Sequence, residues 1–368
     1  MSCCSKPSST SNPTTDACSA SGCRSSEILD SVNDYYGKDL QSTEDLRTDA
    51  CKTAGAPPSY QRKILSRIHE EVLARYYGCG TPIPPALPGA VVLDLGCGTG
   101  RDVYLAAALV GEQGHAIGVD MTDEQLEIAH RHEEYHRKEF GYERSNVQFH
   151  KCFIEDLSAA GIEDNSIDVV ISNCVVNLSP DKEKVLREIY RVLKPGGELY
   201  FSDVYADRRI PEELQKDKVL WGECLSGALY RGDFRRLAIA VGFQDVRVLS
   251  SNRVSVNAKS DKIAQQTACF RFYSELVRAF KLPSLEDRCE DYGQTATYLG
   301  SIPECPHAFF LDAEHVFVTD HPTRVCGNTA SMLAETRYAK HFRVSERGAH
   351  QGLFDCSSGG GGSTGESG

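Results

Sequence analysis

Long apolar runs and an excess of positive charge are both missing from this chain of 368 residues, and each absence excludes a class of function. No apolar run approaches the roughly 20 residues that a helix needs to cross a bilayer, so we expect no membrane partner. The formal net charge of −12 disfavours nucleic acid as a partner. The first 26 residues are rich in Ser, Thr and Cys but lack the apolar core of a secretory signal. These features predict a cytoplasmic protein, with a plastid leader as the lesser alternative.

The length of the chain predicts two domains, because single hydrophobic cores stop growing beyond about 250–300 residues. We expect a disordered Cys/Ser-rich tail at 1–26, a main domain with a helical extension at 27–258, a smaller α+β domain at 259–350 and a flexible Gly/Ser-rich tail at 351–368. We expect the protein to be a monomer.

Short β-branched runs alternate with amphipathic stretches through the main domain. Strands are predicted at 91–95, 116–120, 147–150, 168–172 and 198–202, and helices at 60–77, 101–109, 122–140, 181–193 and 212–223. This alternation predicts a Rossmann-like, doubly wound α/β sheet with ligands at the carboxyl ends of its strands. Farther on we expect a closing antiparallel pair at 243–249 and 254–256, extended structure at 308–318, and a helix at 325–342 capped by Asn328 or Thr329.

A glycine-rich turn follows the first predicted strand, in the run VVLDLGCGTGR at 91–101. Its three glycines permit a tight turn and close approach of the backbone to a ligand. A dinucleotide-binding fingerprint would need glycine three residues after Gly98, where the chain has Arg101. Asp120 ends the next strand, where a carboxylate can accept hydrogen bonds from both ribose hydroxyls. Together with LKPGGELYFSD at 193–203, the pattern resembles the S-adenosylmethionine (SAM) site of class I methyltransferases.

Fifteen cysteines are many for a chain without a secretory signal. A reducing compartment disfavours a structural disulfide framework, and the odd count leaves at least one thiol unpaired. The cysteines therefore indicate thiophilic or redox chemistry, although several can simply be core residues.

Four of these cysteines are candidates for chemistry, each with a plainer alternative. Cys174 follows the fourth strand, where ligands bind in this architecture, or it is a small buried residue at a strand end. Cys79 lies between two glycines that end a helix, and Cys224 lies beside Glu223 and the only tryptophan. Cys51 stands in a polar stretch that reads equally well as a loop. Their spacing is unlike that of a conventional zinc site.

An ordered series of motifs carries a more specific resemblance: YYGCG, DLGCGTGRD, GVDMT, SNCVVNLSPDK, LKPGGELYFSDVY and LWGECLSGALY. The series, from about residue 34 to residue 342, resembles the arsenic(III) SAM methyltransferases, or arsenite methyltransferases, and most of all their eukaryotic and algal members. The resemblance implies a class I SAM-dependent methyltransferase that methylates trivalent arsenic for detoxification. Arsenite or arsenic–thiol conjugates would be the substrate, SAM the methyl donor, and a thiol such as glutathione or thioredoxin the reductant.

The resemblance also implies the site residues. Cys79, Cys174 and Cys224 correspond to arsenic ligands, and Cys51 to a fourth functional cysteine that can form a disulfide with Cys79. For SAM we expect contacts from Tyr77, Gly78, Gly96, Cys97, Gly98, Gly100, Arg101, Asp120, Met121, Ile154, Glu155 and Asn173.

Thiolates suit this chemistry because trivalent arsenic is soft and three sulfur ligands leave its lone pair exposed as the nucleophile. The methyl step then needs alignment rather than a general base. Three other functions remain open at this point: a SAM-dependent methyltransferase for a small organic acceptor, a cysteine-rich protein that sequesters soft metals, and a redox sensor.

Overall fold

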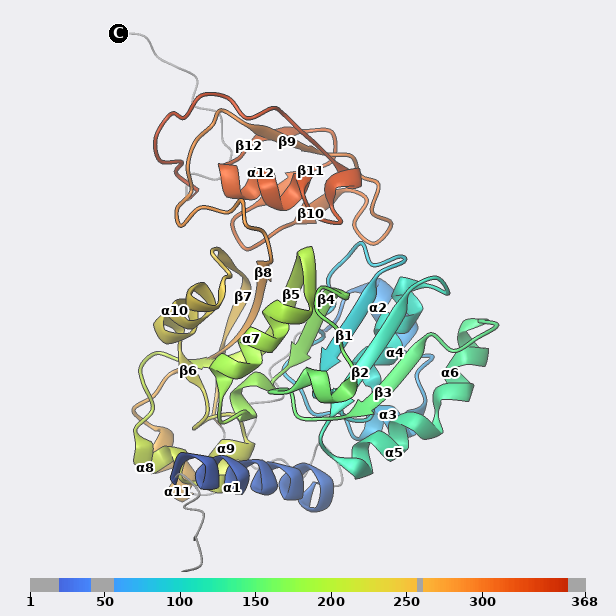
Figure 1. Ribbon diagram of the computed structural model, residues 1–368, viewed down its shortest axis with the longest axis vertical. Coiled ribbons are helices and arrows are strands. Elements are labelled where there is room, and N and C mark those ends of the chain that lie inside the picture. The colour runs from blue at the N-terminus through green and yellow to red at the C-terminus, as the bar shows by residue number, and fades with distance from the viewer. Residues whose placement is uncertain (1–19, 41–55, 257–260, 357–368) are drawn as a thin grey trace, which may run out of the picture.

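An eight-stranded mixed sheet forms the centre of the computed structural model, which describes residues 20–40, 56–256 and 261–356 (Figure 1). The strand order is β3-β2-β1-β4-β5-β8-β7, and the short β6 pairs with β5. The strands are β1 (Val91–Leu95), β2 (His115–Asp120), β3 (Val147–Lys151), β4 (Ile167–Asn173), β5 (Leu193–Ala206), β6 (Leu229–Tyr230), β7 (Val246–Val254) and β8 (Phe272–Phe280). Strands β1 to β5 pair in parallel, whereas β8 runs antiparallel to both β5 and β7. The predicted class I methyltransferase fold is confirmed.

Helices surround this sheet on both faces and at one end. They are α1 (Ala20–Asp34), which continues into a π-helical turn (Tyr35–Asp39), α2 (Ser59–Leu65), α3 (Glu70–Ala74), α4 (Arg101–Val110), α5 (Asp123–Arg131), α6 (Glu133–Phe140), α7 (Lys182–Val192), α8 (Glu212–Gln215), α9 (Lys218–Gly222), α10 (Arg231–Val241) and α11 (Asp261–Thr267). Within the described ranges, no helix is both long and apolar enough to pass through a bilayer.

Successive residues of the central strands pack into two separate cores. Leu93 of β1 and Val170 of β4 face the core that contains α7 and α10. Their neighbours Val92 and Val169 face the core that contains α2, α3, α4 and α5. Because side chains alternate across a strand and both faces are covered, these strands read as continuous apolar runs in the sequence.

Each of three predicted helices is divided into two shorter helices in the structure. The helix expected at 60–77 is α2 followed by α3, because the His69 side chain caps α3 by accepting a backbone hydrogen bond. The helix expected at 212–223 is α8 followed by α9, whose first turn is capped by Asp217. The helix expected at 122–140 breaks between α5 and α6.

The predicted domain boundary at residue 259 is wrong. Strand β8 lies between β5 and β7 in the main sheet, so the smaller domain begins after Phe280. The pair expected at 243–249 and 254–256 is instead the single strand β7, which pairs with β8. Both errors have one cause: the antiparallel partner of β5 and β7 is β8, which comes later in the chain than either of them.

The smaller domain is α+β, as predicted. Its strands are β9 (Thr295–Tyr298), β10 (Ala308–Phe310), β11 (Val316–Val318), β12 (Pro322–Arg324) and β13 (Phe342–Val344), and its helix is α12 (Gly327–Ala334). Strand β9 lies between β12 and β13, while β10 pairs with β11. The helix is shorter than expected, and its cap is neither Asn328 nor Thr329 but Cys326, whose sulfur accepts a hydrogen bond from the Thr329 N–H.

Both predicted tails are shorter than expected, because part of each belongs to the folded structure. Helix α1 begins at Ala20, inside the tail expected at 1–26. At the other end, the Phe354 N–H donates to the carbonyl of Cys289, so residues up to Cys356 pack on the small domain. Residues 1–19 and 357–368 lie outside the described residues.

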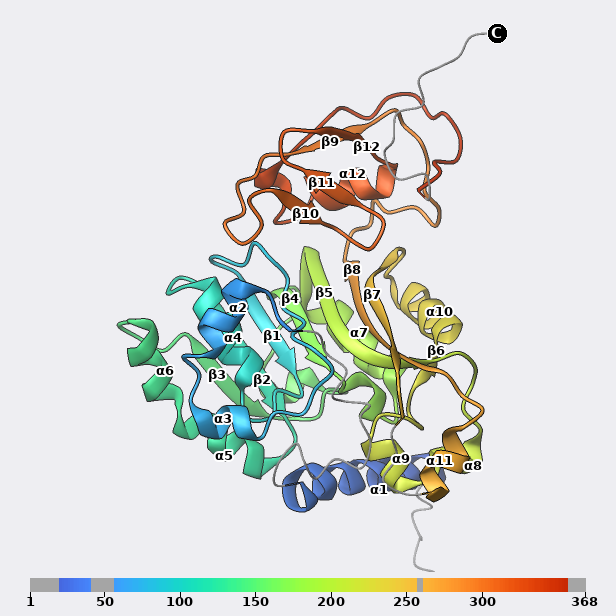
Figure 2. The same cartoon turned by 180° about the vertical axis from the view of Figure 1, so that it is seen from behind.

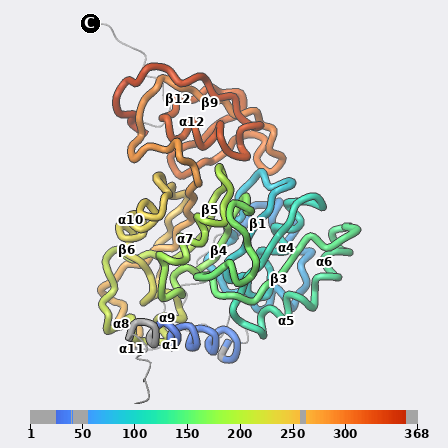
Figure 3. The backbone as a smooth tube through the Cα atoms, in the orientation of Figure 1, coloured from blue at the N-terminus to red at the C-terminus, as the bar shows by residue number. Residues whose placement is uncertain are grey.

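The small domain lies against the amino ends of the parallel strands, at the opposite end of the sheet from α1 (Figures 1 and 2). Figure 3 shows that it is one continuous C-terminal segment. Glu198, near the start of β5, is fully buried and pairs with Arg278 of β8 and with Arg337 of the small domain. Arg337 also donates to the carbonyl of Pro85, just before β1. The opposite, carboxyl end of the sheet is therefore left for ligands.

Candidate active site

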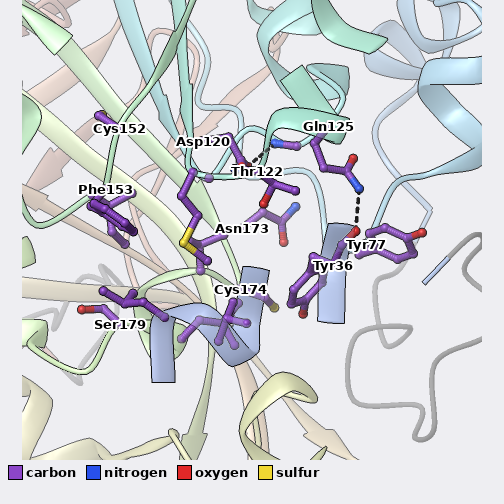
Figure 4. Close-up of a pocket in the computed structure, with 18 of the residues that line it drawn as sticks. Tyr36, Tyr77, Asp120, Thr122, Gln125, Cys152, Phe153, Asn173, Cys174 and Ser179 are labelled. Carbon is purple, nitrogen blue, oxygen red and sulfur yellow. Dashed lines mark hydrogen bonds between the residues drawn. The ribbon is translucent and has the colours of Figure 1, made fainter. Parts of the chain in front are cut away.

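A pocket opens at the carboxyl ends of β1, β2 and β4, and residues of α1 line its other side (Figure 4). The pocket and its open mouth together contain about 790 Å³ of space. Of the predicted site residues, those that line it are Tyr77, Gly96, Gly98, Asp120, Met121, Ile154, Glu155, Asn173 and Cys174. The predicted positions Gly78, Cys97, Gly100 and Arg101 do not line it.

The glycines after β1 meet different demands. Gly96 has a φ of +66°, and a Cβ there would lie 2.5 Å from Val175, so only glycine fits. Gly98 has a φ of +53°, but a Cβ would find its nearest neighbour at 3.8 Å, which leaves the backbone open to the pocket. Gly100 packs instead against the Phe149 ring, so its role is structural.

Asp120 holds this turn in place from the end of β2. One carboxylate oxygen accepts a hydrogen bond of 2.8 Å from the Gly98 N–H, and the other accepts one of 2.9 Å from the Thr122 N–H. Burial raises the pKa of the Asp120 carboxyl above its usual range, and these hydrogen bonds oppose that shift. The carboxylate also faces the pocket, where its remaining lone pairs can accept from hydroxyl groups.

Arg101 points away from the pocket. Its guanidinium lies 3.7 Å from the centre of the Tyr76 ring and donates to Thr81 Oγ1 and to the Gly80 carbonyl. The guanidinium is buried beside Asp102. Its hydrogen bonds to Gly80 and Thr81 support the loop that carries Cys79. The expected contact between Arg101 and SAM therefore has no counterpart in the pocket lining.

Cys97 is part of the helix-covered core. Its sulfur packs against Gly118, where an added Cβ would lie 2.7 Å away. Burial raises the pKa of the Cys97 thiol well above its ordinary value, so this cysteine is not a thiolate.

Asn173 connects the end of β4 to the turn that carries Cys79. Its Oδ1 accepts a hydrogen bond of 2.8 Å from the Cys79 N–H, and its Nδ2 donates to the Gly80 carbonyl at 2.7 Å. A Cβ on Gly78 would lie 2.8 Å from Asn173, so glycine there permits the close approach. This clamp brings Cys79 beside Cys174, although they are 95 residues apart in sequence.

Cys79 and Cys174 are joined by a disulfide, with their Cα atoms 6.3 Å apart. The expected pairing of Cys79 with Cys51 is therefore not the one in this structure, and Cys51 itself lies outside the described residues. The Asn173 clamp gives the physical reason, because it fixes the Cys79 backbone directly against the end of β4.

Cys224 completes the group from a third segment. It is fully buried, and its thiol donates a hydrogen bond of 3.1 Å to the carbonyl of Cys174. All three predicted arsenic ligands belong to one buried cluster. Cys174 and Cys224 both have a φ near +60°, which non-glycine residues rarely adopt and which is enriched at functional sites.

Several residues around this cluster were not predicted. Gln125 donates a hydrogen bond of 3.0 Å to the carbonyl of Tyr36 (Figure 4). The Tyr36 hydroxyl in turn donates at 2.9 Å to the carbonyl of Gly222. The turn after α1 thus links the pocket to the segment of Cys224. The Asp203 carboxyl is also buried nearby, and burial raises its pKa to about 7. No local sequence pattern marks these residues, because their partners are far along the chain.

The polar groups of the pocket fit the adenosine part of SAM. Among the described residues, Glu155 Oε2 and Gln125 Oε1 are buried acceptors without a hydrogen-bond partner, and both residues line the pocket. Glu155 can accept from an adenine amino group, Asp120 can accept from ribose hydroxyls, and Met121 and Ile154 supply an apolar wall. With the parallel sheet and the open turn at Gly98, these groups define a SAM-dependent methyltransferase.

Comparisons with known proteins identify the family. A methyltransferase-domain model matches residues 87–253, and a model of the arsenite methyltransferase C-terminal domain matches residues 292–360. The arsenite methyltransferase of Aquipseudomonas alcaligenes is 52% identical over 90% of this chain and 95% of its own length. That of Homo sapiens is 43% identical over 87% of this chain and 84% of its own. The crystal structure of an arsenic(III) SAM methyltransferase from Chlamydomonas reinhardtii has 51% identity and a TM-score of 0.78, covering 82% of this chain and all of that one. The chain belongs to the arsenite methyltransferases.

Proposed function

We propose that this enzyme transfers methyl groups from SAM to trivalent arsenic held by Cys79, Cys174 and Cys224 in their reduced form. One observation carries the proposal: Cys174 both lines the SAM pocket and joins the other two cysteines. Arsenic held by these three sulfur atoms would therefore lie at the edge of the pocket.

The three thiolates suit the substrate because trivalent arsenic prefers soft ligands and a pyramidal arrangement. SAM, when bound, supplies an electrophilic methyl group on a sulfonium sulfur. The chain contributes positioning: Asp120 and Glu155 orient the nucleoside, and Asn173 fixes the turn of Cys79 relative to Cys174. Alignment of this kind can lower a barrier by several kcal/mol without a general base.

The disulfide between Cys79 and Cys174 suggests how the enzyme returns arsenic to the trivalent state. Methyl transfer formally oxidises arsenic by two electrons, to the pentavalent state. When Cys79 and Cys174 form their disulfide, their two arsenic–sulfur bonds break, and two electrons stay with the methylated arsenic, which returns to the trivalent state. A thiol such as glutathione or thioredoxin then reduces the disulfide. This redox cycle is part of the same proposal, which also takes the enzyme to be a monomer in the cytoplasm.

The decisive test compares wild type with Cys174→Ser, given arsenite, labelled SAM and a dithiol, with speciation of the arsenic products. We expect methylated arsenic from wild type, and a loss of at least about 100-fold in the variant because one sulfur ligand of three is removed. Cys269→Ser, which changes an exposed cysteine outside the cluster, is the matched control. Equal activity in Cys174→Ser and Cys269→Ser would reject the three-thiolate site, and no methylated arsenic from wild type that binds SAM would favour the organic-acceptor alternative.

A further inference from the structure

The small domain contains a second group of three cysteines. The sulfur atoms of Cys289, Cys326 and Cys356 all lie within 4.8 Å of one another. Cys326 is fully buried, and the other two are half-buried. They come from the loop after β8, the start of α12 and the last described residue, so the fold brings them together from three segments.

Backbone hydrogen bonds hold these three segments in register. The Phe354 N–H donates to the Cys289 carbonyl at 2.7 Å, and the Gly327 N–H donates to the Glu290 carbonyl at 2.8 Å. A bridge between Glu290 and Leu353 continues the same contact. The cluster is therefore part of the folded domain and does not depend on a chance contact of loops.

Two donors contact the sulfur of Cys326. The Thr329 N–H donates to it at 3.4 Å, and Arg247 Nη2 lies 3.9 Å away. These contacts hold the Cys326 sulfur close to the sulfur atoms of Cys289 and Cys356. Thiols that bind a soft metal or metalloid in this way release their protons on binding.

We propose that Cys289, Cys326 and Cys356 form a second binding site for trivalent arsenic, separate from the active site. Arsenous acid, As(OH)₃, would exchange its three hydroxyl groups for three thiols, forming three arsenic–sulfur bonds and releasing three water molecules with no change of oxidation state. The number of sulfur donors favours trivalent arsenic. Within the described residues, no fourth Cys, His, Asp or Glu ligand atom lies within 4.8 Å of all three sulfur atoms, whereas structural zinc takes four ligands.

The position of the cluster excludes a direct part in methyl transfer. The small domain lies at the amino ends of the parallel strands, and the SAM pocket lies at their carboxyl ends (Figures 1 and 2). Arsenic bound here would therefore not be methylated in place. It would store or withhold arsenite and cross-link the three segments of the small domain, which stabilises that domain by linkage.

The test uses the full chain with Cys79, Cys174 and Cys224 all changed to Ser, so that the active-site ligands are absent. After reduction with a phosphine, the protein is incubated with arsenite and desalted, and arsenic is measured by mass spectrometry and X-ray absorption. We expect one arsenic atom per chain bound by three sulfur atoms. Its retention is independent of methylation, so the outcome is separable from the test of the proposed function.

Adding Cys326→Ser should lower arsenite affinity at least 10-fold, whereas adding Cys305→Ser should not. Cys305 is a matched control because it is a partly buried thiol of the same domain outside the cluster. Serine can still cap α12, so the fold should survive the change at position 326. Cys289→Ser, at a half-buried position, provides a second variant with the same expected loss.

Three results would overturn the proposal: equal arsenic retention in the Cys326→Ser and Cys305→Ser backgrounds, coordination by fewer than three sulfur atoms, or stoichiometric zinc that blocks arsenite. In the otherwise wild-type enzyme, Cys326→Ser should keep the methylation rate and lose one bound arsenic atom. A parallel loss of methylation would also contradict a site separate from the active site.

Discussion

The two ends of the central sheet differ in their backbone conformation and in how their buried polar groups are paired. At the carboxyl end, Gly96, Gly98, Cys174 and Cys224 all have positive φ values, and buried acceptors face an open pocket. At the amino end, Glu198 and Arg278 are fully buried and form an ion pair, and Arg337 of the small domain pairs with the same carboxylate. The carboxyl end thus presents left-handed backbone and unpaired acceptors to a ligand, whereas the buried charges at the amino end compensate one another. The following predictions test that division.

The largest expected effect is on stability, from Glu198→Gln at the amino end. The change removes the buried carboxylate that pairs with Arg278 at 2.7 Å and with Arg337, leaving two arginines uncompensated. We expect a loss of about 3–5 kcal/mol in the free energy of unfolding, measured by urea denaturation. SAM affinity of the folded protein should be unchanged. Glu314→Gln, at an exposed position of the small domain, should stay within about 0.5 kcal/mol of wild type.

A smaller effect should appear in the pH dependence of stability, through Asp203. Burial raises the pKa of this carboxyl to about 7, so the native state holds the proton more tightly than the unfolded chain. The contribution is fully present below about pH 4 and is lost as the pH rises to about 7. Relative to Asp203→Asn, wild type should therefore lose a few kcal/mol of stability, about 1.4 per pKa unit, over this range. Parallel stability profiles for the two proteins would contradict this account.

Asp120→Asn tests the nucleoside site at the carboxyl end. The amide retains one acceptor oxygen but loses the charge that faces the pocket. A hydrogen bond to a charged group contributes about 1.5–3 kcal/mol, so SAM affinity should fall about 10- to 100-fold by calorimetry. Asp123→Asn, an exposed neighbour at the start of α5, should bind SAM as wild type does. Equal loss in both variants would indicate a general electrostatic effect rather than a ribose contact.

The smallest effect concerns the backbone at Cys174, measured under reducing conditions. Because φ is +60° there, Cys174→Gly should be more stable than Cys174→Ala by about 1 kcal/mol. The order should reverse at Cys152, a buried cysteine without a positive φ, where glycine only adds flexibility to the unfolded chain. The same order at both positions would show that the left-handed backbone at Cys174 carries no strain.

The sequence predicts the parts of the molecule that depend on local pattern. Each of the strands β1 to β4 is marked by a short apolar run, and the turn containing Gly98 is marked by its glycine spacing. The site residues Asp120 and Glu155 follow from their places at strand ends. Motif resemblance locates Cys79, Cys174 and Cys224, which no spacing rule connects.

The remainder depends on contacts between distant segments. Strand β8 joins the main sheet because β5 and β7 both need an antiparallel neighbour, which its own sequence does not reveal. Similarly, the choice of Cys174 rather than Cys51 as the partner of Cys79 depends on the Asn173 clamp. The cluster at Cys326 combines residues 289–356, so only the fold discloses it.

The most direct test of the proposed site is a single turnover of fully reduced enzyme with one equivalent of arsenite and SAM, without external thiol. Disulfides are then mapped by mass spectrometry of peptides, alongside speciation of the arsenic. We predict one methyl group on arsenic and a new disulfide between Cys79 and Cys174 in the same fraction of molecules. Methylated arsenic with both cysteines still reduced, or a disulfide between Cys79 and Cys51 in their place, would contradict the account.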